Sequence, residues 1–300
     1  MAQFPRWMIG DQQGSRPKRP AGAKLVRLGG VETVLEGAAD DPYFQGVEQH
    51  ASGLDGLAAL VAAQVPRAST VIDVGANIGL STILLARSVQ RVIAFEPSPA
   101  NLQYLRRNLA SNGIINVEVV AAAVSDRPST LRFHVAQFGA GSHVVAAGHV
   151  LNDGIATIEV PAVTLDGALT VPVSLIKIDA EGHEPDILAG ARAVLERDKP
   201  IIYTEINVWC LSAFAGHSPG AFVRTLFRAF DVGTPQPDGT VVPLPDGYGF
   251  LHDLIVHNKG MADIVLRPRP NVAMPSLPEL AWPEPAVAAL NQAGPHSWPM

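Results

Sequence analysis

The segment Val71-Ile-Asp-Val-Gly-Ala-Asn-Ile-Gly79 constrains the fold of this chain more than any other. Residues 70–74 are mostly apolar and β-branched, which is typical of a buried strand. Gly75 and Gly79 interrupt that run, and residues 80–88 then have the length and composition of a helix. A buried strand that passes through a glycine-containing turn into a helix is the repeating unit of α/β folds with a parallel sheet.

The same alternation of short apolar runs and longer amphipathic runs continues along the chain. It predicts strands over residues 91–95, 116–121, 175–179 and 201–206, and helices over residues 99–111, 185–196 and 220–230. We therefore expect an α/β fold with a mostly parallel sheet and helices on both faces.

One stretch departs from this alternation. Two extended runs, residues 131–135 and 157–160, flank a glycine-rich segment at residues 139–154, so we predict an inserted β-hairpin there. His134, His143 and His149 lie in or beside it. Their irregular spacing and the lack of thiol or carboxylate partners argue against a metal site, so we interpret them as surface or substrate-facing residues.

The two ends of the chain differ from the part between them. Residues 1–22 are basic and contain prolines without any periodicity, which predicts a flexible arm. Residues 267–300 are so rich in proline that regular ladders are excluded, which predicts an extended strap or a disordered tail. We expect residues 23–266 to form one domain, with the cofactor-binding core at about residues 65–210.

Composition narrows the classes of partner. An apolar fraction of 47% and a charged fraction of 17% fit a globular protein, and a net charge of −6 argues against nucleic acid or an anionic membrane as partners. A single cysteine, Cys210, excludes an intramolecular disulfide. With neither a signal-peptide pattern nor an uninterrupted apolar span, we expect a cytoplasmic protein. An oligomer is possible, but nothing in the sequence supports one.

The residues in and after the first turn distinguish two classes of cofactor. A dinucleotide enzyme needs a second glycine where this chain has Asn77, and Asp73 would repel a pyrophosphate. A positively charged sulfonium cofactor has no phosphate and makes Asp73 favourable. Glu96 ends the next strand, about twenty residues further on, where a carboxylate binds ribose hydroxyls. These residues favour S-adenosylmethionine over a nicotinamide cofactor, and over a turn with no ligand.

Five motifs in order resemble the FkbM family of S-adenosylmethionine-dependent methyltransferases. They are Asp73-Val-Gly-Ala-Asn-Ile-Gly79, Phe95-Glu-Pro-Ser-Pro99, Ala123-Val-Ser-Asp126, Lys177-Ile-Asp-Ala-Glu-Gly-His-Glu184 and Pro200-Ile-Ile-Tyr-Thr-Glu205. The resemblance implies a class I methyltransferase (Rossmann-like) sheet of seven strands, with an antiparallel edge strand. It also implies O-methylation of hydroxyls on natural products or glycans.

The resemblance further implies which residues bind the cofactor. The turn would surround the methionine part, Glu96 with Pro97 would bind the ribose, and the third motif would lie near the adenine. The cofactor-binding residues expected are Asp73, Gly75, Ala76, Asn77, Gly79, Glu96, Pro97, Ala123, Ser125 and Asp126.

A second polar cluster follows the strand at residues 175–179. A hydroxyl acceptor must lose its proton during methyl transfer, so a general base is needed. Asp179 is the first candidate because it ends a central strand. His183 has the most suitable ordinary pKa, and Glu205 ends the next strand. Dipole stabilisation at a helix start remains an equal alternative for Glu184.

Three functional alternatives remain open at this stage. Oxygen ligands such as Asp179, Glu181 and Glu205 suit Mg²⁺, but nothing in their spacing requires a metal, and we predict none. An amine acceptor would use the same cofactor site, so N-methylation is the alternative reaction. A binding protein that keeps the fold without the chemistry is the alternative from another class.

Overall fold

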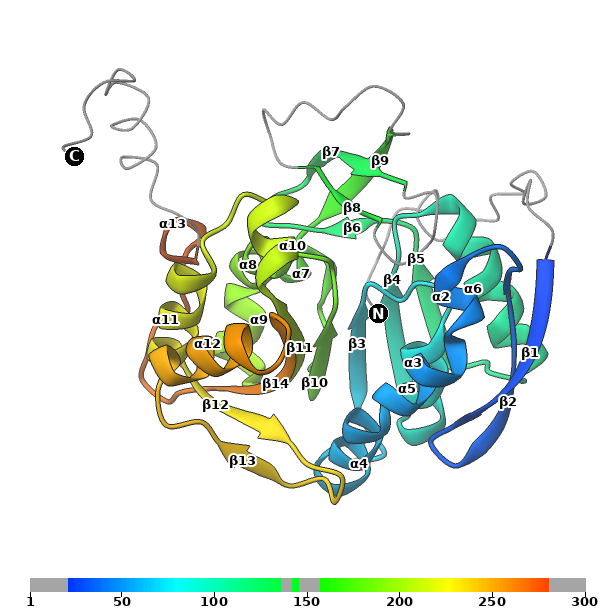
Figure 1. The fold of residues 1–300 in the computed structure, drawn as a ribbon, viewed down its shortest axis with the longest axis horizontal. Coiled ribbons are helices and arrows are strands. Elements are labelled where there is room, and N and C mark those ends of the chain that lie inside the picture. Colours follow the sequence, from blue (N-terminus) through cyan, green and yellow to red (C-terminus); the bar gives the residue numbers. More distant parts are fainter. Residues whose placement is uncertain (1–20, 136–141, 146–156, 281–300) are drawn as a thin grey trace.

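The computed structural model describes residues 21–135, 142–145 and 157–280. His149, most of the predicted N-terminal arm and residues 281–300 of the predicted tail therefore lie outside the described residues. Within these limits the chain forms a large sheet covered by helices, a smaller sheet beside one edge of it and an N-terminal hairpin (Figure 1). The domain boundary at residue 266 stays a prediction.

The large sheet has eight strands: β3 (Thr70–Val74), β4 (Arg91–Phe95), β5 (Val117–Val120), β10 (Leu175–Ile178), β11 (Ile201–Asn207), β12 (Phe230–Pro235), β13 (Val241–Pro243) and β14 (Met261–Pro268). Their order is β13-β12-β14-β11-β10-β3-β4-β5. The five strands from β11 to β5 pair in parallel. The expected class I, mostly parallel α/β sheet is confirmed.

Two details of that sheet correct the prediction. It has eight strands and not seven, and its long antiparallel strand is internal: β14 pairs with β11 on one side and β12 on the other. The antiparallel edge strand is β13, which forms a hairpin with β12. A tight turn permits it, since Gly239 has a φ of 82° and donates its N–H to the Gln236 carbonyl.

Helices cover both faces of the sheet, as predicted. On one face lie α4 (Asp55–Gln64), α5 (Leu80–Ser88) and α6 (Pro99–Ser111), and on the other α8 (Glu184–Ala189), α9 (Arg192–Asp198), α11 (Pro219–Ala229) and α12 (Gly247–Val256). Successive residues of a strand point to opposite faces. In β3, Val71 accordingly packs into the first helical layer and Ile72 into the second.

The predicted single helix over residues 185–196 is two helices. α8 ends at Ala189 with Gly190 as its C-cap, and α9 begins at Arg192. A Cβ on Gly190 would lie 2.0 Å from the Ser125 carbonyl oxygen, so the chain passes another backbone there too closely for a side chain. α5, β4 and α6 have the predicted bounds, and Ser98 with Pro99 begins α6 through a side-chain cap.

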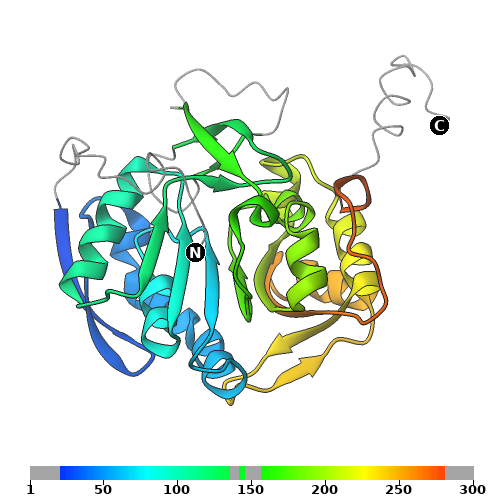
Figure 2. The ribbon, with the colours of Figure 1, turned by 180° about the vertical axis from the view of Figure 1, so that it is seen from behind.

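An N-terminal layer that the sequence patterns did not predict precedes β3. It contains the antiparallel hairpin β1 (Ala21–Leu28) and β2 (Val31–Ala38), followed by α2 (Pro42–Gln45) and α3 (Val47–Gly53). Asn108 in α6 joins the hairpin to the domain, because its side-chain amide exchanges two hydrogen bonds with the backbone of Glu36. Seen from behind, this hairpin flanks α6 at one end of the molecule (Figure 2).

The predicted inserted hairpin is part of a four-stranded sheet. Its strands are β6 (Ala123–Val124), β7 (Ser129–His134), β8 (His143–Val144) and β9 (Thr157–Val163), in the order β6-β9-β7-β8. Because β6 follows directly after β5, this sheet lies beside the carboxyl ends of the large sheet (Figures 1 and 2). His134 and His143 face each other, with 3.4 Å between their Nδ1 atoms, and His143 stacks on Phe214.

The described part of the proline-rich segment packs against the domain. Arg192 donates from Nε to the Met274 carbonyl, Met274 is buried, and Thr225 donates to the Glu279 carbonyl. The last described residues of this segment form the short helix α13 (Leu277–Leu280). Among the helices described, none combines the length and apolar character needed to cross a bilayer. A cytoplasmic location stays a prediction.

Candidate active site

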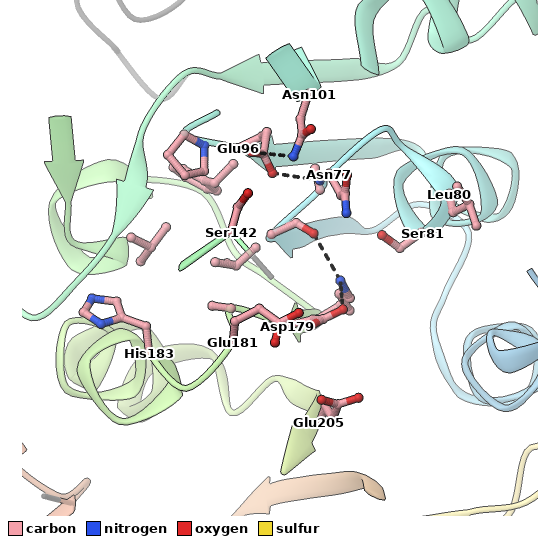
Figure 3. A pocket seen from close by; sticks show the side chains of 18 of the residues that line it. Asn77, Leu80, Ser81, Glu96, Asn101, Ser142, Asp179, Glu181, His183 and Glu205 are labelled. Atoms are coloured by element: carbon pink, nitrogen blue, oxygen red, sulfur yellow. Dashed lines mark hydrogen bonds and ion pairs between the residues drawn. The ribbon is translucent and has the colours of Figure 1, made fainter. Parts of the chain in front are cut away.

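A cavity of about 280 Å³ opens where β3, β4 and β10 end (Figure 3). This is the edge at which open α/β sheets bind ligands. Most of the predicted site residues line it: Gly75, Ala76, Asn77, Glu96, Pro97, Ala123, Asp179, His183 and Glu205. Asp73, Gly79, Ser125 and Asp126 do not line it.

The two glycines of the first turn bring strand ends together. Gly75 has a φ of 79°, and a Cβ on it would lie 1.8 Å from the carbonyl oxygen of Asp179. Gly79, with a φ of 103°, packs against Leu105 in α6. The turn after β3 therefore rests directly on the end of β10, which places the glycine motif next to Asp179.

Asp73 is an anchor beneath the cavity. Its side chain is fully buried and accepts hydrogen bonds from Ser81 Oγ at 2.9 Å and Thr82 Oγ1 at 2.6 Å. Its other oxygen lies 3.6 Å from Lys177 Nζ. Asp73 thus acts on the cavity through Lys177 and the start of α5.

Glu96 organises the part of the cavity next to the turn. Its carboxylate accepts from the backbone N–H groups of Asn77 and Ser98, each at 2.8 Å, and from the Asn101 amide at 3.3 Å (Figure 3). Burial raises the pKa of Glu96 to about 7, against these hydrogen bonds. Asn77 Oδ1 is buried and finds no hydrogen-bond partner among the described residues, so this region presents an unsatisfied acceptor.

An apolar surface continues from Glu96 along β6. Pro97, Ala122, Ala123, Val124 and Phe133 line it. Ser125 and Asp126 lie just beyond this surface, where Ser125 Oγ is 3.0 Å from His183 Nε2. We call the part of the cavity lined by Asn77, Glu96 and this apolar surface the cofactor half.

Asp179 stands at the opposite side of the cavity and is about half exposed, at 47% of its side chain. Lys177, only 5% exposed, holds it through a contact of 3.3 Å between Nζ and Oδ2, and also donates to the Gly75 carbonyl. Burial opposes the charge on Lys177, but the neighbouring carboxylates Asp179 and Asp73 outweigh burial and raise its pKa.

Three more carboxylates surround Asp179. We call Asp179, Glu181, Glu205 and Asp263 the acidic wall; all four line the cavity. Burial, then the charge of Asp179, raises the pKa of Glu181 to about 7. Burial and the charges of the rest of the wall raise that of Glu205 to about 8. Glu181 also has a φ of 53°, an unfavourable conformation for a non-glycine residue that is often found at functional sites.

His183 belongs to a different group of contacts. It is buried at the start of α8, bonded to Ser125 and 3.4 Å from Asp186, which in turn lies 2.6 Å from His217 Nε2. Burial lowers the pKa of His183. Figure 3 shows it on the side of the cavity away from Glu205. A role as base stays a prediction, and the contacts around His183 are those of a residue that joins α8 to β6.

Glu184 fits the structural alternative. It is buried, and its Oε1 accepts from the backbone N–H groups of Ala180 and Gly182 at 3.0 and 3.3 Å. Burial raises its pKa to about 7. Glu184 therefore closes the turn that presents Asp179 and Glu181.

Several cavity residues were missed by the sequence patterns. Tyr43 and His50, from the N-terminal layer, stack with ring centroids 4.2 Å apart and line the cavity, as does Asp263 in β14. No motif marks them, because they come from segments without a recognisable pattern. The position of Lys177 could have been interpreted from the sequence, because a charged residue inside the apolar strand at residues 175–178 requires a buried partner. Among the residues described, no group of His, Cys, Asp and Glu is arranged to hold a metal ion.

Comparison with known proteins extends this picture. A sequence model described as the methyltransferase FkbM domain matches residues 73–228. A search of curated proteins finds no match. Structural comparison finds a methyltransferase FkbM from Methylobacillus flagellatus KT, at 17% identity and a TM-score of 0.38. The aligned part is 67% of this chain and 44% of that one, so the chain spans less than half of that relative.

Two further similar structures are rRNA methylases. One, from Streptococcus thermophilus, has 14% identity and a TM-score of 0.40, over 71% of this chain and 93% of that one. The other is a T. thermophilus 16S rRNA methyltransferase in complex with AdoMet and guanosine, with 16% identity and a TM-score of 0.42, over 85% of this chain and 52% of that one. The prediction that nucleic acid is excluded as a partner is therefore wrong. Proteins of similar structure act on rRNA, and a net charge does not describe the charge around one cavity.

Proposed function

Because the chain belongs to the FkbM family of S-adenosylmethionine-dependent methyltransferases, we propose that it methylates a hydroxyl group of a small molecule, natural product or sugar. The observation that carries this proposal is the Asp179 carboxylate. It lies in the cavity opposite the cofactor half, partly exposed and held in place by Lys177. A carboxylate in that position can accept a proton from an acceptor.

The cofactor half has the groups that S-adenosylmethionine requires. Glu96 offers a carboxylate for ribose hydroxyls, and the surface around Pro97 and Ala123 suits an adenine ring. The unsatisfied Asn77 Oδ1 suits a donor such as the ammonium of the methionine part. Gly75, Ala76 and Gly79 shape this end of the cavity. Ser125 and Asp126, which follow β6 directly, would support the adenine side.

The bound cofactor supplies an electrophilic methyl group on a positively charged sulfur. The residues of the chain supply alignment and proton transfer. The cofactor would supply the methyl group, whose bond to sulfur breaks, with the electron pair left on sulfur, as the bond to the acceptor oxygen forms. Asp179 would take the hydroxyl proton, and Lys177 keeps its carboxylate in one place. Glu205 lines the same cavity and would orient the acceptor, and burial together with the neighbouring carboxylates raises its pKa to about 8. Asp73 holds Lys177 from below.

A binding and turnover experiment tests this proposal. Calorimetry first measures the binding of S-adenosylmethionine and of its demethylated product. Candidate hydroxyl acceptors, including sugars and RNA, are then incubated with labelled cofactor, and mass spectrometry distinguishes oxygen-linked from nitrogen-linked methyl groups. Asp179→Asn should bind the product normally and lower kcat by about 10²–10⁴-fold. Normal turnover of this variant, or label on nitrogen only, would refute the proposed reaction.

A further inference from the structure

The acidic wall concentrates negative charge on one side of the cavity. Glu205 in β11 and Asp263 in β14 are directly opposite each other in the antiparallel register, an arrangement that is unfavourable for like charges. Asp179 and Glu181 face the same space from the turn after β10. Mutual repulsion within the wall contributes to the raised pKa of Glu205. A protein keeps such a pair inside a cavity only at a cost to its stability.

The cations of the described residues do not balance this charge. Lys177 is the one lysine, arginine or histidine of the described chain within ion-pair distance of the wall, and it lies between Asp179 and Asp73. The other three members contact neutral groups. Glu181 contacts Cys210 Sγ, Glu205 contacts the Asn207 amide, and Asp263 accepts from the Tyr203 hydroxyl. The positive sulfur of a bound cofactor offsets one charge and leaves the others.

An aromatic surface faces the same space and is independent of the carboxylates. Tyr43 and His50 are stacked with 20° between their rings, and both line the cavity. Burial lowers the pKa of His50, which favours the neutral ring. The faces of aromatic rings attract cations, ammonium groups included.

We propose that the acceptor carries an ammonium group, which binds between the Tyr43–His50 pair and the carboxylates of Glu205 and Asp263. The acceptor class is then an amino alcohol or amino sugar, and its hydroxyl is presented to Asp179. This inference rests on the proposed function for the position of the reacting hydroxyl. It rests on the wall and the aromatic pair for the ammonium group.

The first test uses matched pairs of amines and their N-acetylated forms. Thermal shift and calorimetry, with the demethylated cofactor at saturation, are run with glucosamine, galactosamine and 2-aminoethanol and with the acetylated form of each. We expect the amines to raise Tm by several degrees and the acetylated forms to have no effect. Equal binding of both forms, or no stabilisation by any of the amines, would overturn the inference.

The second test changes the wall. Glu205→Gln and Asp263→Asn should each weaken amine binding at least tenfold. Above pH 8, where the Glu205 carboxyl is charged, each should also raise the Tm of the unliganded protein, because repulsion is relieved. Glu32→Gln, on the exposed hairpin, should change neither. A lower Tm together with unchanged amine affinity would show that the wall is only structural.

The outcomes separate this inference from the proposed function. Failure to bind the cofactor or its product refutes the proposed function whatever the amines do. Methyl transfer to the nitrogen of a bound amine refutes the hydroxyl assignment and supports the ammonium site. Methylation of neutral hydroxyl acceptors, with no preference for amines, refutes the ammonium site and supports the proposed function.

Discussion

Replacing Lys177 with methionine tests the central contact of the site. Methionine keeps most of the apolar length of the side chain and removes only the ammonium group. Asp73, fully buried, then loses the ammonium group 3.6 Å away and keeps two hydroxyl donors, Ser81 and Thr82. Breaking a buried ion pair by removing one partner costs about 3–5 kcal/mol. Since the two hydroxyls remain, we expect a value near the lower end, about 3 kcal/mol.

The measurement is urea unfolding at pH 7, followed by circular dichroism. The midpoint should fall with little change in the m-value, because the surface exposed on unfolding is nearly the same. A double variant, Lys177→Met with Asp73→Asn, is the matched control, since its amide keeps an acceptor for the hydroxyls without a buried charge. It should recover at least half of the lost stability.

Two results would refute this reasoning. A loss below about 1 kcal/mol for Lys177→Met would mean that water reaches Asp73 and that the pair is not a buried one. Failure of Asp73→Asn to restore stability would mean that Lys177 acts through packing or through the Gly75 carbonyl, and not through Asp73.

Three further predictions address the turn, the cofactor half and the acidic wall. Gly75→Ala should lower the free energy of unfolding by at least about 2 kcal/mol, because a Cβ at this position would lie 1.8 Å from the Asp179 carbonyl oxygen. Gly30→Ala is the control, since Gly30 has a similar φ of 82° but no atom within 4 Å of its added Cβ. Equal losses of stability for the two variants in urea unfolding would contradict the close-approach argument. Glu96→Gln should weaken binding of the demethylated cofactor about 10–100-fold, since hydrogen bonds to a charged group contribute about 1.5–3 kcal/mol. Calorimetry measures this affinity, and an unchanged Kd would exclude the role of Glu96 in binding the ribose. The pKa of Glu205 is raised from 4.5 to about 8 in the folded protein, so the unfolded chain loses this proton at a lower pH than the folded chain. The free energy of unfolding should therefore fall as pH rises from 4.5 to 8, by up to about 1.4 kcal/mol per pH unit. In denaturant titrations at several pH values Glu205→Gln should show a smaller fall, and a pH dependence identical to that of the unmodified protein would refute the assignment.

Local signals explain which parts of the fold were predicted well. The helix at residues 99–111 has the predicted bounds, because Ser98 caps it and Pro99 suits its first turn. The strand at residues 91–95 is an apolar run that any parallel sheet buries. In contrast, β14 pairs with β11 and β12, which are separated from it in the chain, so its internal position depends on long-range register that a local pattern does not contain.

The site shows the same division. The glycine turn, Glu96 and Asp179 were found from sequence because each follows a recognisable strand in a fixed motif. Tyr43 and Asp263 were missed because their contribution depends on where two unpatterned segments meet the carboxyl edge of the sheet. A motif can also leave the surroundings of a residue undetermined. The sequence placed His183 in a motif but did not reveal that its ring contacts Ser125.

The sequence by itself determined the class of sheet, the cofactor and the family, because these depend on side-chain periodicity and on a few residues at fixed spacing. Only the tertiary structure decided what surrounds the reacting group. Residues from the N-terminal layer, β10, β11 and β14 are far apart in the chain. Their charges and rings act on one another only because folding places them around one cavity. Gly75 connects the local motif with the tertiary site, because a residue without a side chain lets the turn after β3 pack directly against the backbone of Asp179.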